Sequence, residues 1–354
     1  MVNLEWYWED PRINVLLEKA TRSLGELNAF TLIVPDVDLF IHMHVLKEAN
    51  TSSRIEGTRT EMDEAVLSED EILPERRDDW REVQNYVRAM NTAIDELERL
   101  PLSLRLLKET HGILLDGARG EWKAPGEFRT SQNWIGGTSI SDAAFIPPHH
   151  NDIQELLSDL EKFWHNDEIQ VPHLIRCALS HYQFETIHPF LDGNGRIGRL
   201  LITLYLVSNG LLAKPSLYLS SYFEKRRGAY YDSLTRVRES NDISHWIRFF
   251  LQAVTETAEK GKDTLQRLLV LRHEVDNEVI KLGRRAENAQ KLLIHLYKNP
   301  AVTVSEVMDL LDLQYHPANK LVAALVECRI LQEVPNQQRN RTFLFGSYLN
   351  VFKE

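Results

Sequence analysis

Residues 188–199 bring together side chains whose types and spacing suit chemistry on a phosphate ester. The run reads HPFLDGNGRIGR. Its histidine has an ordinary pKa that suits proton transfer near neutral pH, and its one aspartate could hold Mg²⁺ together with nucleotide phosphates. Its glycines allow close approach of the backbone, and such a turn at a helix N-terminus favours anions. With two arginines as phosphate clamps, the run predicts nucleotidyl or phosphoryl transfer.

Helices are the elements that must hold this run, because apolar residues recur at helical spacing through most of the chain. We expect the glycine-rich turn to lie just before an apolar helix that starts near Ile197, and His181 to share a helix face with His188. Residues 133–148, NWIGGTSISDAAFIPP, break the pattern with a Gly-Gly turn signal and two prolines, and they predict a small β-hairpin. The predicted helices span residues 11–27, 37–48, 79–100, 152–164, 171–186, 198–209, 230–238, 244–282 and 288–298.

The last part of the chain, residues 286–354, has a different character. A helix is followed by a helix–turn–helix pattern and a short hairpin with Arg339 and Arg341 at its tip, which predicts a winged-helix-like domain. The helix expected at 317–331 carries only two basic residues, so contact with protein is favoured over DNA binding, which stays an alternative. The predicted division is 1–100, an N-terminal helical region; 101–260, a catalytic core; 261–285, a linking helix; and 286–354, the winged-helix-like domain.

The 188–199 run matches the HPF…GNGR…R motif of the Fic family at every fixed position, and the chain is similar to that family beyond the motif. PGEFRT at 125–130, FIPPHH at 145–150 and RRGAYYDSL at 226–234 resemble the family's flap and the border of its adenine pocket. The run is not the GxxxxGK pattern of a P-loop. The resemblance covers most of residues 37–255. It implies a mainly α fold, namely a Fic-type helical bundle with a small β-hairpin flap, followed by the winged-helix-like domain.

The resemblance also implies a reaction, in which AMP passes from ATP to a Ser, Thr or Tyr hydroxyl of a target protein and pyrophosphate leaves. His188 would take the hydroxyl proton, and Asp192 would hold Mg²⁺ against the α- and β-phosphates. Arg196 would contact the β- and γ-phosphates, and Arg199 would hold the γ-phosphate. Tyr231 would border the nucleotide, with ordinary core packing as the alternative. The residues assigned to ATP through backbone and side-chain groups are Gly193, Asn194, Gly195, Arg196, Ile197, Gly198 and Arg199.

A second motif lies in the N-terminal region and reads SSRIEG, residues 52–57. It matches the family's inhibitory pattern, with Ser52, Glu56 and Gly57 at the fixed positions. The resemblance implies that Glu56 pairs with Arg199 and takes the place of the γ-phosphate, so that ATP binds only in an unproductive pose. The alternative is a solvated glutamate near a helix end.

The amino-acid composition excludes several other classes of protein. Lys and Arg number 41 against 52 Asp and Glu, and the resulting net charge of -11 argues against broad, non-specific nucleic-acid binding. The two cysteines, Cys177 and Cys328, form no CxxC pair, so we expect neither a disulfide framework nor a cysteine zinc site, and we expect a cytoplasmic protein. The most apolar run, 200–213, is too short to span a bilayer.

Other functions stay open at this level. Transfer of phosphate or of another nucleotide is one alternative, and a nucleotide-sensing regulator acting through the C-terminal domain is another. The second glycine and both arginines of the motif favour AMP transfer, and the intact His188 argues against a mere sensor. The resemblance further implies a homo-oligomer, in the form of a dimer, autoadenylylation, and a target protein aligned along residues 133–148 by strand addition.

Overall fold

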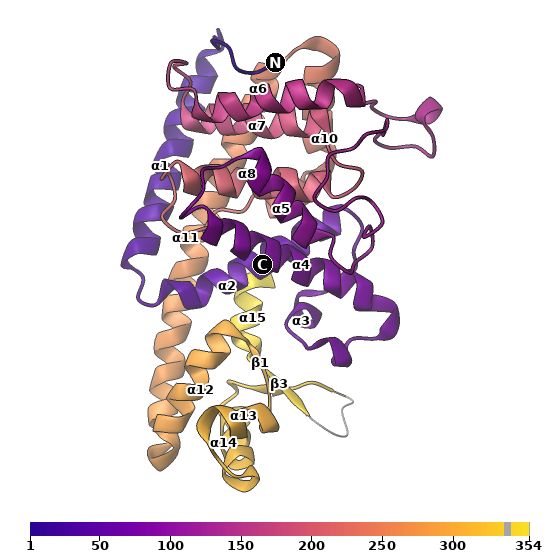
Figure 1. The fold of residues 1–354 in the computed structure, drawn as a ribbon. Coiled ribbons are helices and arrows are strands. Elements are labelled where there is room, and N and C mark those ends of the chain that lie inside the picture. The colour runs from indigo at the N-terminus through magenta and orange to yellow at the C-terminus, as the bar shows by residue number, and fades with distance from the viewer. Residues whose placement is uncertain (336–340, 354) are drawn as a thin grey trace.

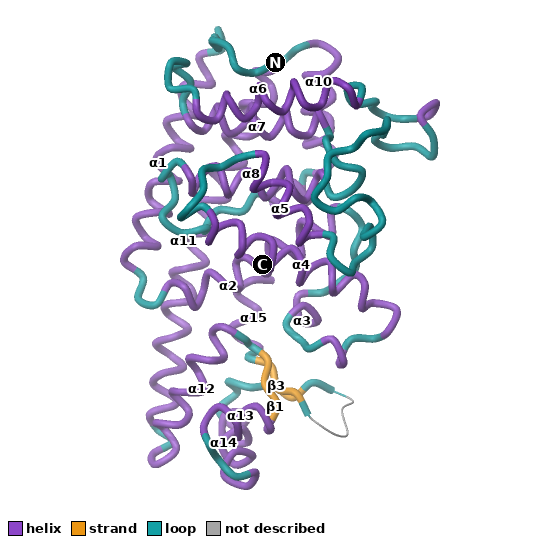
Figure 2. The backbone as a smooth tube through the Cα atoms, in the orientation of Figure 1, coloured by secondary structure: helices purple, strands orange, loops and turns teal. Residues whose placement is uncertain are grey.

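The computed structural model describes residues 1–335 and 341–353. Helices dominate it, and the chain forms an upper helical bundle and a smaller C-terminal part below it (Figures 1 and 2). The helices of the bundle are α1 (Pro11–Ile33), α2 (Val37–Ile55), α3 (Met62–Ala65), α4 (Arg77–Glu96), α5 (Leu104–Leu114), α6 (Ile153–His165), α7 (His173–Ile187), α8 (Asn194–Ser208), α9 (Ser220–Lys225), α10 (Arg227–Ser240) and α11 (Ile243–Ile280). The mainly α fold predicted from the sequence is confirmed.

Helix α8 lies at the centre of the bundle because it is apolar on nearly every side. Every residue from Arg196 to Leu206 is buried, and the helix contacts α2, α4, α5 and α7. A helix with apolar residues all round can be stable only in the interior of a domain. This placement fixes the N-terminal end of α8, which carries the glycine-rich run, against its neighbours.

Helix α11 joins the two parts of the molecule. It has 38 residues, about 57 Å at 1.5 Å per residue, and it runs from the bundle to the lower end of the molecule (Figure 1). It packs along α1 in the bundle and against α12 and α15 in the C-terminal part. Asp242 caps its start by accepting a hydrogen bond from the backbone N–H of His245.

The predicted hairpin at 133–148 is reduced to a single bridge. Ile135 and Phe145 exchange two backbone hydrogen bonds of 2.9 and 3.1 Å, and no longer strand forms among the described residues of this segment. The Asp142 carboxylate holds the turn instead, since it accepts hydrogen bonds from the backbone N–H groups of Thr138 and Ser139 at 2.9 and 2.6 Å. The predicted hairpin is thus present as one bridged pair of residues, with its turn held by the Asp142 side chain.

The C-terminal part contains the elements that the sequence predicts, with one strand, β1 (Ala301–Thr303), and one helix, α15 (Gly346–Lys353), more. Its other elements are α12 (Ala286–Lys298), α13 (Val304–Leu311), α14 (Tyr315–Glu327), β2 (Gln332–Glu333) and β3 (Thr342–Leu344). The three strands form an antiparallel sheet in the order β1-β3-β2. Arg339 lies outside the described residues, and Arg341 pairs with Glu333 at 3.2 Å. The winged-helix identity of this part stays a prediction.

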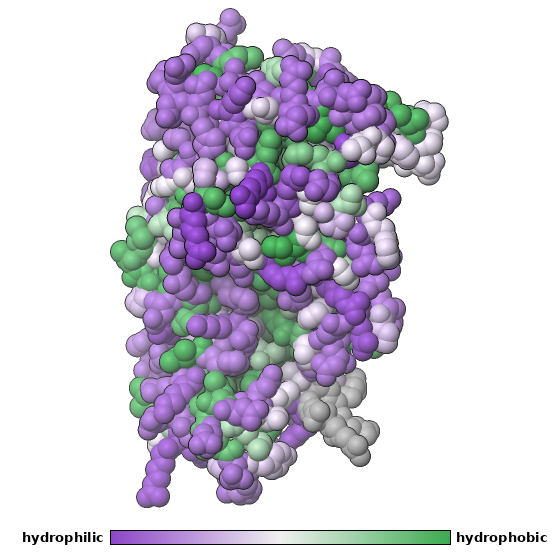
Figure 3. All heavy atoms as spheres, in the orientation of Figure 1, coloured by the Kyte–Doolittle hydropathy of each residue, from purple (hydrophilic) through white to green (hydrophobic). Residues whose placement is uncertain are grey.

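Hydrophilic side chains predominate on the face drawn in Figure 3. In the part of the chain that the structure describes, no helix is both long and apolar enough to cross a bilayer.

Candidate active site

The loop between α7 and α8 begins at His188. This residue ends α7 in the left-handed region, at φ 51° and ψ 59°, and its N–H donates to the Phe184 carbonyl at 2.9 Å. Gly193 precedes α8 with a φ of 74°. The Asn194 side chain closes the loop, because its Oδ1 accepts from the Phe190 N–H and its Nδ2 donates to the Phe190 carbonyl, both at 2.8 Å.

One expectation for this run is corrected by the geometry. Helix α8 begins at Asn194 rather than near Ile197, so Gly195 to Arg199 lie within its first turns. The Asn194 side chain closes the loop, and its contact with phosphate stays a prediction. The early start of α8 keeps the N-terminal N–H groups and the positive end of the helix dipole at the glycines, as an anion site requires.

Ile197 and Gly198 face the interior. Ile197 is fully buried, and the Gly198 carbonyl accepts a hydrogen bond from Nδ1 of His181 at 2.8 Å. A Cβ on Gly198 would overlap the carboxylate of Glu185. The Ile197 N–H donates to the Gly193 carbonyl at 3.0 Å, so these two positions set the packing of α8, and the phosphate site is left to the residues that precede them.

Arg199 is brought together with both expected inhibitory residues. Its Nε donates to the Ser52 hydroxyl at 2.8 Å, and its Nη2 donates to the Ser52 carbonyl at 2.9 Å and to Glu56 Oε1 at 2.7 Å. The Arg199 side chain is 2% exposed and that of Glu56 is 36% exposed. Burial opposes ionisation of Glu56, but the adjacent guanidinium more than offsets it, so the pKa of Glu56 lies below its usual value.

Two glycines make this pairing sterically feasible. Glu56 is the residue that ends α2, and Gly57 follows it with a φ of 108°, which turns the chain away from the helix. Gly195 passes directly beneath the Glu56 carboxylate, and a Cβ there would overlap it. The glycine of the motif therefore admits either a carboxylate or a phosphate at this point.

Arg196 has a partner that the sequence analysis missed. Its Nη1 donates to Glu82 Oε2 at 3.0 Å, and both side chains are buried. Glu82 also accepts from Arg119 Nε at 2.8 Å. Burial raises the pKa of Glu82 although both arginines lower it. A signal was present, since Glu82 stands four residues before the buried Tyr86 on the inward face of α4.

Asp192 is placed so that its side chain could serve as the one carboxylate ligand of a Mg²⁺ ion. Its side chain is 41% exposed and lies 3.7 Å from Arg196, and its Oδ1 accepts from the Gly193 N–H at 2.6 Å. No cluster of three or more His, Cys, Asp or Glu that could hold a metal occurs within residues 1–335 and 341–353. The remaining ligands of a Mg²⁺ ion would thus come from phosphates and water, as is usual for this ion in nucleotide sites.

The His188 ring is available for proton transfer. Its Nδ1 has no hydrogen-bond partner among the described residues. Burial lowers the pKa of His188 to about 4, against a smaller opposing effect of Glu56. The imidazole is therefore neutral at pH 7 and can accept a proton.

A second carboxylate, Glu185, lies one helical turn before His188 and was also missed. It is buried, and its Oε1 has no hydrogen-bond partner in the described part of the chain. Burial raises the pKa of Glu185 to about 7, with Arg199 lowering it and Glu56 raising it further. Arg199 therefore interacts electrostatically with the carboxyl groups of Glu48, Glu56 and Glu185, and of these three it is hydrogen-bonded to Glu56.

The sequence left two roles open for Tyr231, a contact with the nucleotide and packing in the core, and its neighbour Tyr230 bears on both. Tyr230 is 1% exposed and its hydroxyl is 2.9 Å from His181 Nε2, so this pair belongs to the core. Tyr231 is 39% exposed, with the Arg227 guanidinium 5.8 Å from its ring centre. The core role falls to Tyr230, and the nucleotide role of Tyr231 stays a prediction.

Arg129 ties the flap to the motif, a function that sequence reasoning did not assign. Its guanidinium donates to the carbonyls of His188, Ser131 and Pro148 at 3.0, 3.0 and 2.6 Å. Asn133 adds a hydrogen bond to the Phe190 carbonyl at 3.0 Å. Both ends of the flap are therefore bound to the loop that carries His188.

Known proteins share these features. The model of the Fic/DOC family N-terminal region matches residues 15–95, and that of the Fic/DOC family matches residues 101–206, together more than half of the chain. A protein adenylyltransferase Fic from Drosophila erecta is 33% identical over 133 residues, which are 37% of this chain and 24% of that protein. The one from Drosophila melanogaster is 32% identical over 165 residues, 46% of this chain and 30% of that protein. The chain thus spans less than a third of the length of these relatives.

Solved structures show the same fold. A Fic family protein from Desulfovibrio desulfuricans superposes with a TM-score of 0.61 at 20% identity, covering 97% of this chain and 98% of that one. A Fic domain-containing signalling protein from Bacteroides thetaiotaomicron gives 0.56 at 17% identity, covering 71% and 97%. Taken with the two family matches and the HPFLDGNGRIGR loop at their centre, these likenesses establish that the chain belongs to the Fic/DOC family.

Proposed function

We propose that this chain is a protein adenylyltransferase, which transfers AMP from ATP to a hydroxyl side chain of a target protein. The observation that carries the proposal is the position of His188, whose pKa is lowered by burial, on the loop that leads into the glycine-rich start of α8. The two Drosophila relatives are named for the same activity. A base next to an anion site meets the two needs of hydroxyl transfer to a phosphorus atom.

Each residue then has a defined part. The target hydroxyl gives its proton to His188, its oxygen forms a bond to the α-phosphorus, and the bond to pyrophosphate breaks. The N–H groups at the start of α8 and the side chains of Arg196 and Arg199 hold the phosphates. Mg²⁺, held by Asp192, would neutralise phosphate charge. The flap backbone around Ile135 offers its edge to an extended target segment.

We further propose that Glu56 restrains this activity. Its carboxylate occupies the Arg199 guanidinium, which is the group assigned to the γ-phosphate. Ser52 holds the same guanidinium through two further hydrogen bonds. A γ-phosphate can reach Arg199 only when the Glu56 carboxylate moves away, and its 36% exposure leaves it room to do so.

Incubation of purified protein with Mg²⁺ and ATP labelled at the α-phosphate tests both proposals, because label on the chain itself needs no known target. We expect weak labelling of the wild type, strong labelling of Glu56→Gly, and none of the Glu56→Gly/His188→Ala double variant. Glu168→Gly is the matched control, since it removes an exposed glutamate from a turn outside the site. Equal labelling of wild type and Glu56→Gly would remove the restraint from the proposal.

The position of the label decides the reaction. Transfer from γ-labelled ATP instead of α-labelled ATP would identify phosphate transfer and refute AMP transfer. Where neither label appears on the chain, titration with ATP decides whether the glycine-rich run binds a nucleotide. Absence of ATP binding by Glu56→Gly would refute the whole assignment.

For the C-terminal part we propose contact with protein rather than DNA. Arg341, one of the two arginines assigned to the hairpin tip, is neutralised by Glu333, and α15 packs against α2, α3 and α11 of the bundle. Both observations favour a structural role. A gel-shift assay with duplex DNA across salt concentrations tests this, because binding that weakens steeply with salt would contradict it.

A further inference from the structure

Arg238, near the end of α10, contacts the flap segment 133–148. The centre of its guanidinium lies 3.8 Å from the centre of the Phe145 ring, and Phe145 is the residue that exchanges backbone hydrogen bonds with Ile135. A guanidinium over an aromatic face is attracted by the ring, and the attraction grows where water is excluded. Burial lowers the pKa of Arg238, so its charge is partly shielded from water. The contact therefore holds the bridged pair of the flap by its aromatic side chain.

The same guanidinium reaches the end of α7. Its Nη2 donates to the Glu185 carbonyl at 3.3 Å, three residues before His188, the residue that ends α7. Burial is the main cause of the low pKa of His188, and the charge of Arg238 lowers it further. Arg238 thus connects the flap with the helical turn that leads into the proposed base.

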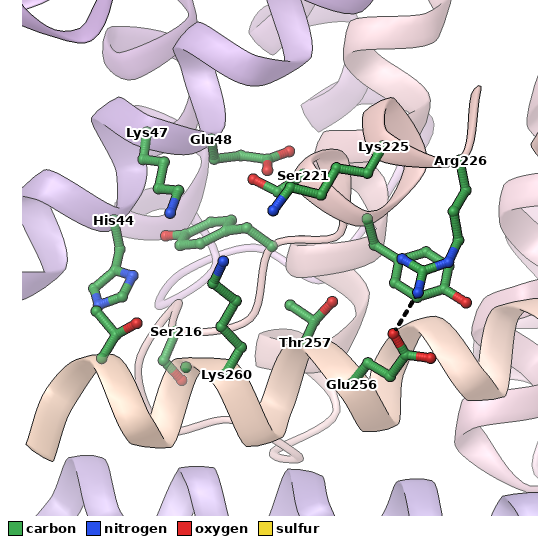
Figure 4. Close-up of a pocket in the computed structure, with 14 residues that line it drawn as sticks. His44, Lys47, Glu48, Ser216, Ser221, Lys225, Arg226, Glu256, Thr257 and Lys260 are labelled. Carbon is green, nitrogen blue, oxygen red and sulfur yellow. Dashed lines mark hydrogen bonds and ion pairs between the residues drawn. The ribbon is translucent and has the colours of Figure 1, made fainter. Parts of the chain in front are cut away.

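Helix α10 is a fixed support for this contact. The residues of its inner face are buried, namely Tyr230, Ser233, Leu234 and Val237, and the helix packs against α9 and α11. At its start, Arg226 pairs with Glu256 of α11 at 2.7 Å, the ion pair drawn as a dashed line in Figure 4. A side chain carried by a packed helix is placed more precisely than one on a loop, so Arg238 can hold the flap at a set position on the bundle.

The flap is thereby attached to the bundle at its ends and at its middle. Arg129 binds the two ends, at the carbonyls of Ser131 and Pro148. Arg238 binds the middle, at Phe145. Even a complete two-stranded hairpin is marginally stable by itself in water, and a single bridged pair has less to hold it. The closed state of the bridge therefore depends on the contact between Arg238 and Phe145.

We propose that Arg238 is a positioning residue for the transfer reaction, which fixes the bridged pair of the flap at a set distance from His188. The inference rests on the proposed function, in which the flap backbone around Ile135 aligns the segment that receives AMP. Reacting atoms must lie about 3–3.5 Å apart, and a displacement of about 1 Å can cost roughly 10²-fold in rate. Arg238 has no need to touch the substrate, because it acts through Phe145.

Hydrogen exchange at the N–H groups of Ile135 and Phe145 tests the contact without reference to any activity. Each N–H is donated across the bridge, so it exchanges when the bridge opens. We expect both to exchange about tenfold faster in Arg238→Ala, as for loss of a desolvated cation–π pair, while amides within α8 exchange as in wild type. Arg236→Ala is the matched control, since that arginine of the same helix is exposed and pairs with Asp242 at 3.2 Å. Unchanged exchange in Arg238→Ala overturns the proposal.

Two variants of Phe145 separate its aromatic face from its bulk. Phe145→Leu loses the face and should speed exchange at the bridge as much as Arg238→Ala does, whereas Phe145→Tyr keeps the face and should exchange as wild type does. The double variant Arg238→Ala/Phe145→Leu should exchange no faster than either single variant, because both changes remove one shared contact. Effects that add in the double variant would contradict the proposed contact.

Transfer of the α-label measures the positioning role, with Glu56→Gly as the parent. We expect Arg238→Ala and Phe145→Leu to lower the initial rate at saturating ATP by roughly tenfold or more, Phe145→Tyr to retain most of the rate, and Arg236→Ala to match the parent. Unchanged transfer together with faster exchange would refute the positioning role and leave the proposed function intact. Absence of transfer in the parent itself would refute the proposed function, and this role with it.

Discussion

Replacing Glu185 by glutamine should change how the stability of the protein depends on pH. Burial raises the pKa of this carboxyl to about 7 from an ordinary value of about 4.3. Between these two values the folded state holds a proton that the unfolded state has lost, so the free energy of unfolding falls as pH rises through that window. At 1.36 kcal/mol for each pKa unit, the loss amounts to about 4 kcal/mol, most of it between pH 5 and 8.

The assay is urea unfolding of wild type and Glu185→Gln at a series of pH values from 5 to 8. Glutamine has the same shape as the protonated acid and does not ionise, so the variant should be less pH-dependent and should exceed wild type by about 4 kcal/mol at pH 8. Glu168→Gln, at an exposed position, controls for loss of a carboxylate as such. A wild type and a Glu185→Gln variant with parallel pH profiles would refute the reasoning.

Removal of the Glu56 carboxylate is a second test of this prediction. Glu56 raises the pKa of Glu185, and Arg199 lowers it. In Glu56→Gly the repulsive charge is gone, and the guanidinium of Arg199 loses the carboxylate that it binds. We therefore expect the pKa of Glu185 to fall and the pH dependence of stability to shrink in Glu56→Gly.

Three further predictions concern the motif itself. Asn194→Ala removes both hydrogen bonds to Phe190 and should lower the urea midpoint by an amount equivalent to about 1–3 kcal/mol; a smaller loss would mean that other contacts hold the loop. Gly198→Ala places a methyl group on the Glu185 carboxylate and should cost about 1–3 kcal/mol, seen as a lower melting temperature than wild type. In the Glu56→Gly background, His188→Ala should reduce the initial rate of α-label transfer by about 10²–10⁴-fold, and a loss below tenfold would exclude His188 as the base.

The helices and the motif could be predicted because their signals are local. The apolar spacing that predicted helices at 152–164 and 288–298 is reproduced by α6 and α12 within a residue or two. The pairing of Glu56 with Arg199 followed from a resemblance to known proteins rather than from the residues alone. Local pattern says which residues form an element and little about what lies opposite them.

Contacts between residues distant in sequence were harder to predict. Glu82 meets Arg196 across 114 positions of the chain, and no spacing rule reaches that far. In the loop after His188, the Asn194 side chain satisfies both backbone groups of Phe190, which its place in the motif did not predict. At the flap, one pair of backbone hydrogen bonds joins Ile135 to Phe145, and the Asp142 carboxylate accepts from the turn N–H groups of Thr138 and Ser139.

The length of α11 has a consequence for how the molecule comes apart. One uninterrupted helix supplies apolar side chains both to the bundle, through α1 and α7, and to the C-terminal part, through α12 and α15. If either part unfolded, the section of α11 that packs against it would lose its tertiary contacts. Helices in proteins are stabilised more by such contacts than by the intrinsic helix propensity of their residues. The two parts should therefore unfold together, as one cooperative unit with a single calorimetric transition, in place of the two that separately folded domains on a linker would give.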